Sequence, residues 1–171
     1  MSSLPILVYG NQVLRKRAKP VAAVTPALKR LADDMLDSMY ASNGIGLAAP
    51  QVGESLRLIV VDVSGGEDGK KNPLVLFNPV IISSRGEAIA EEGCLSVPEV
   101  WADVTRPEII TMRAVDREGK AFEFKNVDGI LARCIQHEID HLEGVLFVDK
   151  ISATDRMLNE ARLKKMARGA K

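Results

Sequence analysis

The sequence predicts an α+β fold, and two observations support this prediction. Segments with the apolar pattern of strands are grouped between residues 57 and 125, whereas the helical patterns lie before and after them. Two of the strand segments are separated only by a short polar turn at residues 116–119, which is typical of an antiparallel hairpin. Grouped strands favour antiparallel sheets with separate helices over a wound parallel sheet.

The first helix is predicted over residues 25–42. Thr25 is of a residue type that caps helices, and Pro26 suits the first helical position. The apolar residues of this segment recur on one helical face: Leu28, Leu31, Met35, Leu36 and Met39. We expect Gly44 to end the helix, and a Gly/Ala-rich segment follows at residues 44–51.

Four strands and two further helices complete the predicted elements. The strands are expected at residues 57–62, 74–82, 107–115 and 121–125, with a polar turn at residues 64–69. A second helix is expected to begin near Asp128 and end at Gly144, and a third to run from about Ala153 to Arg168. Ser152 and Asp155 are placed as a capping box for the third helix.

Length, charge and cysteine content exclude several classes of protein. The 171 residues favour a single domain at residues 1–171, with residues 152–171 as its C-terminal helix. Lysine plus arginine equals aspartate plus glutamate at 23 each, so no net charge attracts the chain to DNA or to a membrane. No apolar run approaches the roughly 20 residues that span a bilayer. Two cysteines are too few for a disulfide scaffold, and we expect a cytoplasmic location.

The strongest functional signal is an H-E-x-x-H motif, formed by His137, Glu138 and His141 on the second predicted helix. Residues four apart share one helix face, so both imidazoles can bind one metal ion. Glu138 lies about 100° further round the helix than His137, where its carboxylate can take a proton from water at the metal. Two histidines that merely pack on an amphipathic helix are the alternative, which is disfavoured because the chain has no other histidine.

A catalytic metal site usually has three protein ligands and one open position. The third ligand cannot be a histidine, and Phe147 stands where a metzincin would have one. Two alternatives remain. Glu160 lies downstream, as in thermolysin-like sites, but it is in a mixed-charge helical segment where it can pair with Lys164. Cys94 follows a glycine in an extended segment, and its thiolate suits zinc or iron, so the context favours Cys94.

A non-catalytic site, closed by a fourth protein ligand, is an alternative from a different class of protein. The only remaining cysteine, Cys134, lies three residues before His137 on the same predicted helix, which is a poor offset for sharing its metal ion. A small buried side chain is the simpler interpretation of Cys134. The sequence therefore favours an open, catalytic site.

Three segments together resemble the signature motifs of the peptide deformylase family. They are GIGLAAPQ at residues 44–51, EGCLS at residues 92–96 and QHEIDHL at residues 136–142. The resemblance extends from the first predicted helix to Phe147. It implies removal of the formyl group from N-formylmethionine at the start of nascent chains. It also implies antiparallel β-sheets packed around a central HExxH helix, with an N-terminal and a C-terminal helix.

The resemblance further implies roles for individual residues. The residues that resemble the family's metal ligands are Cys94, His137 and His141. Glu138 would activate water and later protonate the leaving amine, while Gln51 and the backbone N–H of Leu95 would stabilise the oxyanion. One divalent ion per chain is expected, Fe²⁺ physiologically, with Zn²⁺, Ni²⁺ or Co²⁺ as substitutes in purified protein.

The substrate is expected to bind around the same motifs. The expected substrate-binding residues are Ile45, Gly46, Gly93, Trp101, Ile130 and Cys134. Ile45 and Gly46 could pair with the peptide as an added strand, and Gly93 would let its backbone approach closely. Ile130 and Cys134 would line an apolar pocket for methionine, although they could equally pack the helix against the sheet. Many relatives carry a basic residue where this chain has Trp101, which could stack over the substrate.

Two expectations concern the surroundings of the site and the partners. Glu92 and Arg106 match family positions able to pair near the metal, and Asp140 could orient a ligand. Basic residues are frequent in the C-terminal helix (Arg156, Arg162, Lys164, Lys165 and Arg168), a region that docks on the ribosome in some bacterial members. A solvated charged face is the simpler interpretation of that helix. The expected partners are N-formylmethionyl peptides, with neither DNA nor a membrane.

Overall fold

The computed structural model describes residues 3–65 and 69–170 of the chain. The strands are β1 (Gly46–Ala48), β2 (Leu58–Val61), β3 (Leu74–Arg85), β4 (Ala88–Cys94), β5 (Val97–Arg106), β6 (Ile109–Val115) and β7 (Ala121–Val127). The α-helices are α1 (Pro26–Ala41), α2 (Gly129–Leu142) and α3 (Ala153–Gly169). Short 3₁₀ helices are η1 (Gln12–Arg15), η2 (Ala49–Val52) and η4 (Phe147–Asp149).

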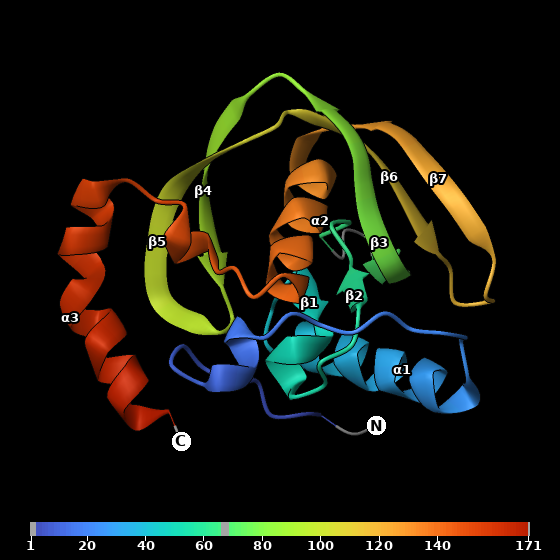
Figure 1. Cartoon of the computed structure of the whole chain (residues 1–171), viewed down its shortest axis with the longest axis horizontal. Helices are drawn as coiled ribbons and strands as arrows, with labels where there is room; N and C mark the ends of the chain where they lie inside the picture. The colour runs from blue at the N-terminus through green and yellow to red at the C-terminus, as the bar shows by residue number, and fades with distance from the viewer. Residues whose placement is uncertain (1–2, 66–68, 171) are drawn as a thin grey trace.

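The strands form two sheets around α2. Antiparallel pairing gives a five-stranded sheet of order β1-β2-β3-β6-β7 and a separate two-stranded sheet of β4 and β5. In Figure 1, α2 runs through the centre of the molecule, with β4 and β5 on one side and β3, β6 and β7 on the other. The predicted α+β class, with antiparallel sheets around a central HExxH helix and a helix towards each end of the chain, is confirmed.

The first helix forms where its sequence pattern places it. The Thr25 side chain accepts a hydrogen bond from the Leu28 amide at 3.2 Å, and Pro26 occupies the first turn. The helix ends differently from the prediction. Asn43 adopts the left-handed conformation with φ of 56°, so that the Gly44 amide can donate back to the Met39 carbonyl at 2.9 Å. Asn43, rather than Gly44, therefore supplies the left-handed residue that ends α1.

The four predicted strands correspond to β2, β3, β6 and β7, and the third predicted helix corresponds to α3. Ser152 caps α3 by accepting from the Asp155 amide at 3.1 Å. Part of the predicted turn at residues 64–69 lies outside the described residues. Strands β1, β4 and β5 were not predicted, and the last two form the hairpin that carries Cys94. A signal for β5 was present, since its buried and exposed residues alternate from Val100 to Arg106.

The buried apolar side chains of the described residues form three clusters. The first packs Ile135 of α2 against the five-stranded sheet, and the second packs Met35 of α1 against β1 and β2. The third packs Val104 of β5 against Phe147 of η4 and Leu163 of α3, which lies along β5 in Figure 1. The HExxH helix and the hairpin that faces it thus pack in different clusters.

Within the described ranges, none of the helices has both the length and the apolar character needed to cross a bilayer.

Candidate active site

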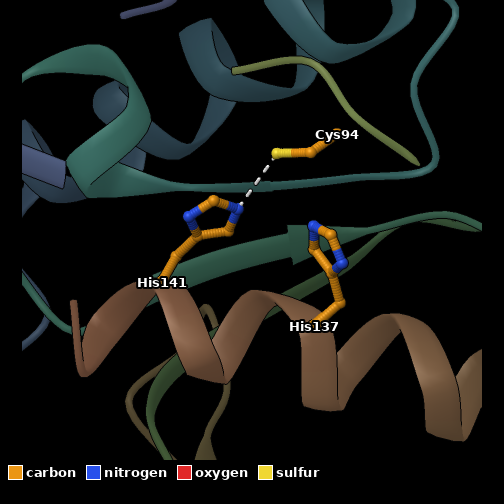
Figure 2. A group of neighbouring side chains, drawn as sticks. All are labelled: Cys94, His137 and His141. Carbon is orange, nitrogen blue, oxygen red and sulfur yellow. Dashed lines mark hydrogen bonds between the residues drawn. The ribbon is translucent and has the colours of Figure 1, made fainter. Parts of the chain in front are cut away.

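The HExxH helix and the β4–β5 hairpin bring together three side chains that could hold a metal ion, called here the metal-binding group. His137 and His141 lie one turn apart on α2 and are both buried, and Cys94 is the last residue of β4. One potential ligand atom from each of the three lies within 4.8 Å of the other two. Figure 2 shows the thiol of Cys94 facing both rings, with its Sγ 3.3 Å from His141 Nε2. Residues far apart in the sequence thus converge on one point.

The chemistry of these donors fits a transition metal ion. One thiolate and two imidazoles suit zinc or ferrous iron, and three protein donors leave a position open for water or substrate. His137 Nδ1 is held by the Glu92 carboxylate at 2.9 Å, which leaves its other ring nitrogen to face the cysteine. A carboxylate that holds one ring nitrogen while the other faces the ligand position is typical of histidines in metal sites.

Glu92 is the buried carboxylate on which this arrangement depends. It accepts hydrogen bonds from Arg106 Nε at 2.6 Å, Arg106 Nη2 at 2.9 Å and Arg133 Nη1 at 2.6 Å, besides its contact with His137. Arg106 also donates to Asp140 of α2 at 2.8 Å. Burial alone would raise the pKa of Glu92, but hydrogen bonds from Arg106 and His137 outweigh it and hold the pKa well below its usual range. The expected pairing of Glu92 with Arg106 is therefore present, and Asp140 joins it.

The two imidazoles have different electrostatic surroundings. Burial lowers the pKa of both rings. For His137, hydrogen bonds to Cys94 and Glu92 outweigh burial and raise the pKa to about 10. For His141, the positive charges of His137 and Arg106 add to burial, so its pKa lies well below the usual range. These surroundings therefore favour the charged imidazolium form of His137 and the neutral form of His141.

Glu138 follows His137 on α2 and is buried beside the three donors. Its Oε2 is buried and has no hydrogen-bond partner among the described residues. Burial raises the pKa of Glu138 to about 7, although His137 and Arg106 act in the opposite direction. The glycine at position 46 makes room for this carboxylate, because a Cβ atom there would lie 2.7 Å from Glu138 Oε1. β1 and α2 can thus approach closely.

The side-chain amide of Gln51 has a fixed orientation. It is only 1% exposed, and its Oε1 accepts from the Ala48 amide at 2.9 Å. Its Nε2 donates to Ser96 Oγ at 3.0 Å and lies 3.6 Å from Cys94 Sγ. The donor end of the amide therefore points toward the metal-binding group. Leu95 follows Cys94 at the turn of the hairpin and lines the same cavity as Gln51.

A cavity of about 770 Å³ lies in front of these residues. All six expected substrate-binding residues line it: Ile45, Gly46, Gly93, Trp101, Ile130 and Cys134. Trp101 is 64% exposed and lies against Gly93, where a Cβ atom would come within 2.3 Å of the indole ring. Burial raises the pKa of Cys134 well above its usual value, so this thiol stays neutral in the wall of the cavity.

The structure also bears on the alternatives for the third ligand. Glu160 lies on α3 and pairs with Lys164 at 3.0 Å, and the metal-binding group found among the described residues contains Cys94 instead. The Cys134 thiol is directed to the Ile45 carbonyl oxygen at 3.5 Å and is not part of that group. These positions disfavour both the metallopeptidase alternative and a site closed by a fourth ligand.

Arg133 is a part of the site for which no role was predicted. Its guanidinium reaches Glu92 and two backbone carbonyls of the hairpin, and it lines the cavity. Its position four residues before His137 was visible in the sequence, but its three acceptors were not.

Fold and site together define a metal-dependent hydrolase of the HExxH type. Residues 3–157 match the family model described as polypeptide deformylase. The peptide deformylase of Alkalilimnicola ehrlichii is 49% identical over 168 residues, covering 98% of this chain and 93% of that protein.

Solved structures of peptide deformylases have the same fold. The enzyme from Legionella pneumophila matches with a TM-score of 0.89 and 48% identity, covering 98% of this chain and 96% of that one. The enzyme from Thermus thermophilus matches with a TM-score of 0.90 and 38% identity, covering 98% of this chain and 99% of that one. The chain belongs to the polypeptide deformylase family of metal-dependent enzymes, which remove N-formyl groups from nascent peptides.

The role of Glu92 leads to a first prediction. Replacing Glu92 with Gln removes the charge that orients His137, and loss of such a carboxylate partner typically lowers metal affinity by about 10–100-fold. Competition with a chelator measures the change. Glu91→Gln is the matched control, since Glu91 precedes it on the same strand but is exposed. Equal metal affinity in the two variants would contradict the orienting role.

Proposed function

We propose that residues 1–171 act as one catalytic domain that hydrolyses the formyl amide of N-formylmethionyl peptides, with residues 152–171 as its C-terminal helix. The observation that carries this proposal is the convergence of Cys94, His137 and His141, together with a cavity that Cys94, His137 and Glu138 line. In this proposal the three converging residues hold a divalent metal ion. A bound ion of this kind lowers the pKa of water at its open position and polarises the formyl oxygen.

Glu138 is the general base and then the general acid in the proposed reaction. Its carboxylate takes a proton from the attacking water as oxygen bonds to the formyl carbon. It returns that proton to the peptide nitrogen as the carbon–nitrogen bond breaks, which releases formate and a peptide with a free amino group. A buried carboxylate with a pKa of about 7 and a free Oε2 supports this role, because a proton can move either way near neutral pH.

Gln51 and Leu95 are the proposed oxyanion donors. The contacts of the Gln51 side chain with Ala48 and Ser96 hold its Nε2 toward Cys94, so little reorganisation is needed when negative charge develops on the formyl oxygen. The Leu95 amide would act from the hairpin turn. Both residues are neutral, so neither changes its protonation state during the reaction.

The peptide is proposed to bind along β1 with its methionine side chain in the cavity. β1 is the last strand of its sheet, so one of its edges is not paired within the sheet and can accept an added strand through Ile45 and Gly46. Ile130, Cys134 and Ile45 would supply apolar contacts to methionine. Gly93 and Trp101 form the opposite wall, where the indole would stack over the residues that follow.

The metal ion is proposed to be Fe²⁺, with Zn²⁺, Ni²⁺ or Co²⁺ as substitutes in purified protein. The donor set of one thiolate and two imidazoles suits iron and zinc alike, and the iron assignment follows the family resemblance. Protein purified without oxygen is expected to contain stoichiometric iron and to lose activity on exposure to air, as measured by elemental analysis and deformylation assays. Stoichiometric zinc with full activity would overturn the assignment.

The C-terminal helix is proposed to stabilise the domain rather than to dock on the ribosome. Two of its basic residues are used internally, since Arg156 donates to the Val148 carbonyl and Arg162 to the Glu99 carbonyl. Lys164 pairs with Glu160 on the helix itself.

A cytoplasmic location is also proposed. Two free thiols support it, because disulfides are rare in the reducing cytoplasm.

One pair of variants tests the third ligand. Cys94→Ala is expected to abolish metal retention and deformylation of formyl-Met peptides, because two imidazoles alone bind the ion too weakly. Glu160→Ala is expected to leave both properties intact, since Glu160 lies on α3 in a salt bridge with Lys164. Metal content and formate release measure both. Loss of metal in Glu160→Ala with retention in Cys94→Ala would overturn the assignment.

A further inference from the structure

The cavity is lined by α2 and by the β4–β5 hairpin, and these two parts pack in different apolar clusters. Ile135 of α2 packs with the five-stranded sheet. The hairpin forms the two-stranded sheet, and its strand β5 packs through Val104 against Phe147 and Leu163. Apolar packing within either cluster therefore does not fix the distance between α2 and β4. Besides the two-residue links that join the hairpin to β3 and β6, polar contacts hold it to α2.

Arg133 makes two such contacts toward the end of β4 remote from the metal-binding group and a third with Glu92. It lies on α2, one turn before His137. Its Nη2 donates to the Ala88 carbonyl at 2.8 Å, and its Nη1 donates to the Val104 carbonyl at 2.9 Å and to Glu92 at 2.6 Å. One guanidinium thus holds both strands of the hairpin to the helix.

These contacts hold a part of β4 that the contacts near the metal-binding group do not reach. Cys94, at the other end of the strand, belongs to the metal-binding group, and Ala88 is six residues away, about 20 Å in an extended strand. Nearer the metal-binding group, Arg106 of the hairpin holds Glu92 beside His137 and also donates to Asp140 of α2. Arg133 is one turn further out, beside Cys134 and close to Ile130, where the methionine side chain is proposed to bind.

We propose that Arg133 is a positioning residue that fixes the separation of β4 from α2 and so sets the width of the methionine pocket. The assignment of this pocket rests on the proposed function. Arginine suits the task because its planar fork offers several donors in a fixed geometry. The side chain is only 14% exposed, so its contacts compete little with water. A lysine could reach one of the acceptors but could not hold two strands at once.

Two variants and a control test this proposal. Arg133→Met keeps a side chain of comparable length without the donors, and Arg133→Lys keeps the charge without the fork. The control is Arg113→Met on β6, where the arginine is exposed and forms one long contact with Glu123 at 3.4 Å. Each variant is assayed as the metal-loaded enzyme on two peptides that differ only in formyl-Met or formyl-Phe at the first position.

Arg133→Met is expected to raise KM for the formyl-Met peptide about tenfold, as the loss of hydrogen bonds to a charged group would, with a smaller change in kcat. The preference for Met over Phe should narrow, because the pocket can widen. Arg133→Lys should lie between this variant and the wild type, and metal content should be unchanged. Wild-type KM and preference in a folded Arg133→Met enzyme would overturn the proposal. A fall in kcat and in metal content of Arg133→Met, with KM unchanged, would also overturn the proposal.

Hydrogen exchange gives a readout that does not depend on activity. Amides of β4 are expected to exchange faster in Arg133→Met than in the wild type or in Arg113→Met, while those of α2 stay protected. Unchanged exchange in β4 would overturn the positioning role. If Arg133→Met does not fold, Arg133→Lys decides by the same measurements. A wild-type chain that releases no formate would refute the proposed function, whereas the exchange comparison would still decide whether Arg133 holds the hairpin.

Discussion

The buried carboxylate of Glu92 is the interaction on which the rest of the site depends. It lies in the β4–β5 hairpin, yet it orients His137 of α2 and balances the charges of Arg106 and Arg133. Removing one member of a buried ionic group typically costs about 3–5 kcal/mol, because the remaining charges stay buried without a partner. Here the loss would also free the imidazole and the hairpin from each other. One side chain therefore links the stability of the fold to the geometry of the metal-binding group.

The site is assembled from three separate parts of the chain, each with a distinct task. α2 supplies the two histidines and Glu138, the hairpin supplies Cys94, and the segment of β1 and η2 supplies Gln51. Close approach of these parts depends on side chains that are absent or small. At Gly46 a Cβ atom would lie 2.7 Å from both Glu138 Oε1 and Cys134 Sγ. The cavity between the parts is thus defined by backbone proximity on the β1 side and by charged contacts on the β4 side.

Much of this architecture follows from patterns in the sequence. Helical periodicity located α1, and the HExxH spacing placed both histidines on one face of α2. The hairpin that carries Cys94 was missed as a pair of strands, because Glu91, Glu92 and the following glycine interrupt the apolar pattern of β4. Glu92 is buried only because two arginines and a histidine surround its carboxylate. The orientation of Arg133 could not be foreseen, since its three acceptors lie 29 to 45 residues away along the chain.

In the proposed reaction Glu138 moves the proton, while the other residues of the site hold and orient. The most direct measurement compares formate release from a formyl-Met peptide by the wild type and by Glu138→Gln, with metal content determined in both. Glutamine keeps the shape of the side chain but cannot take the proton. The expected result is full metal content with a fall in kcat of at least about 100-fold, the usual contribution of a positioned general base. A metal-loaded Glu138→Gln variant with wild-type kcat would contradict the account.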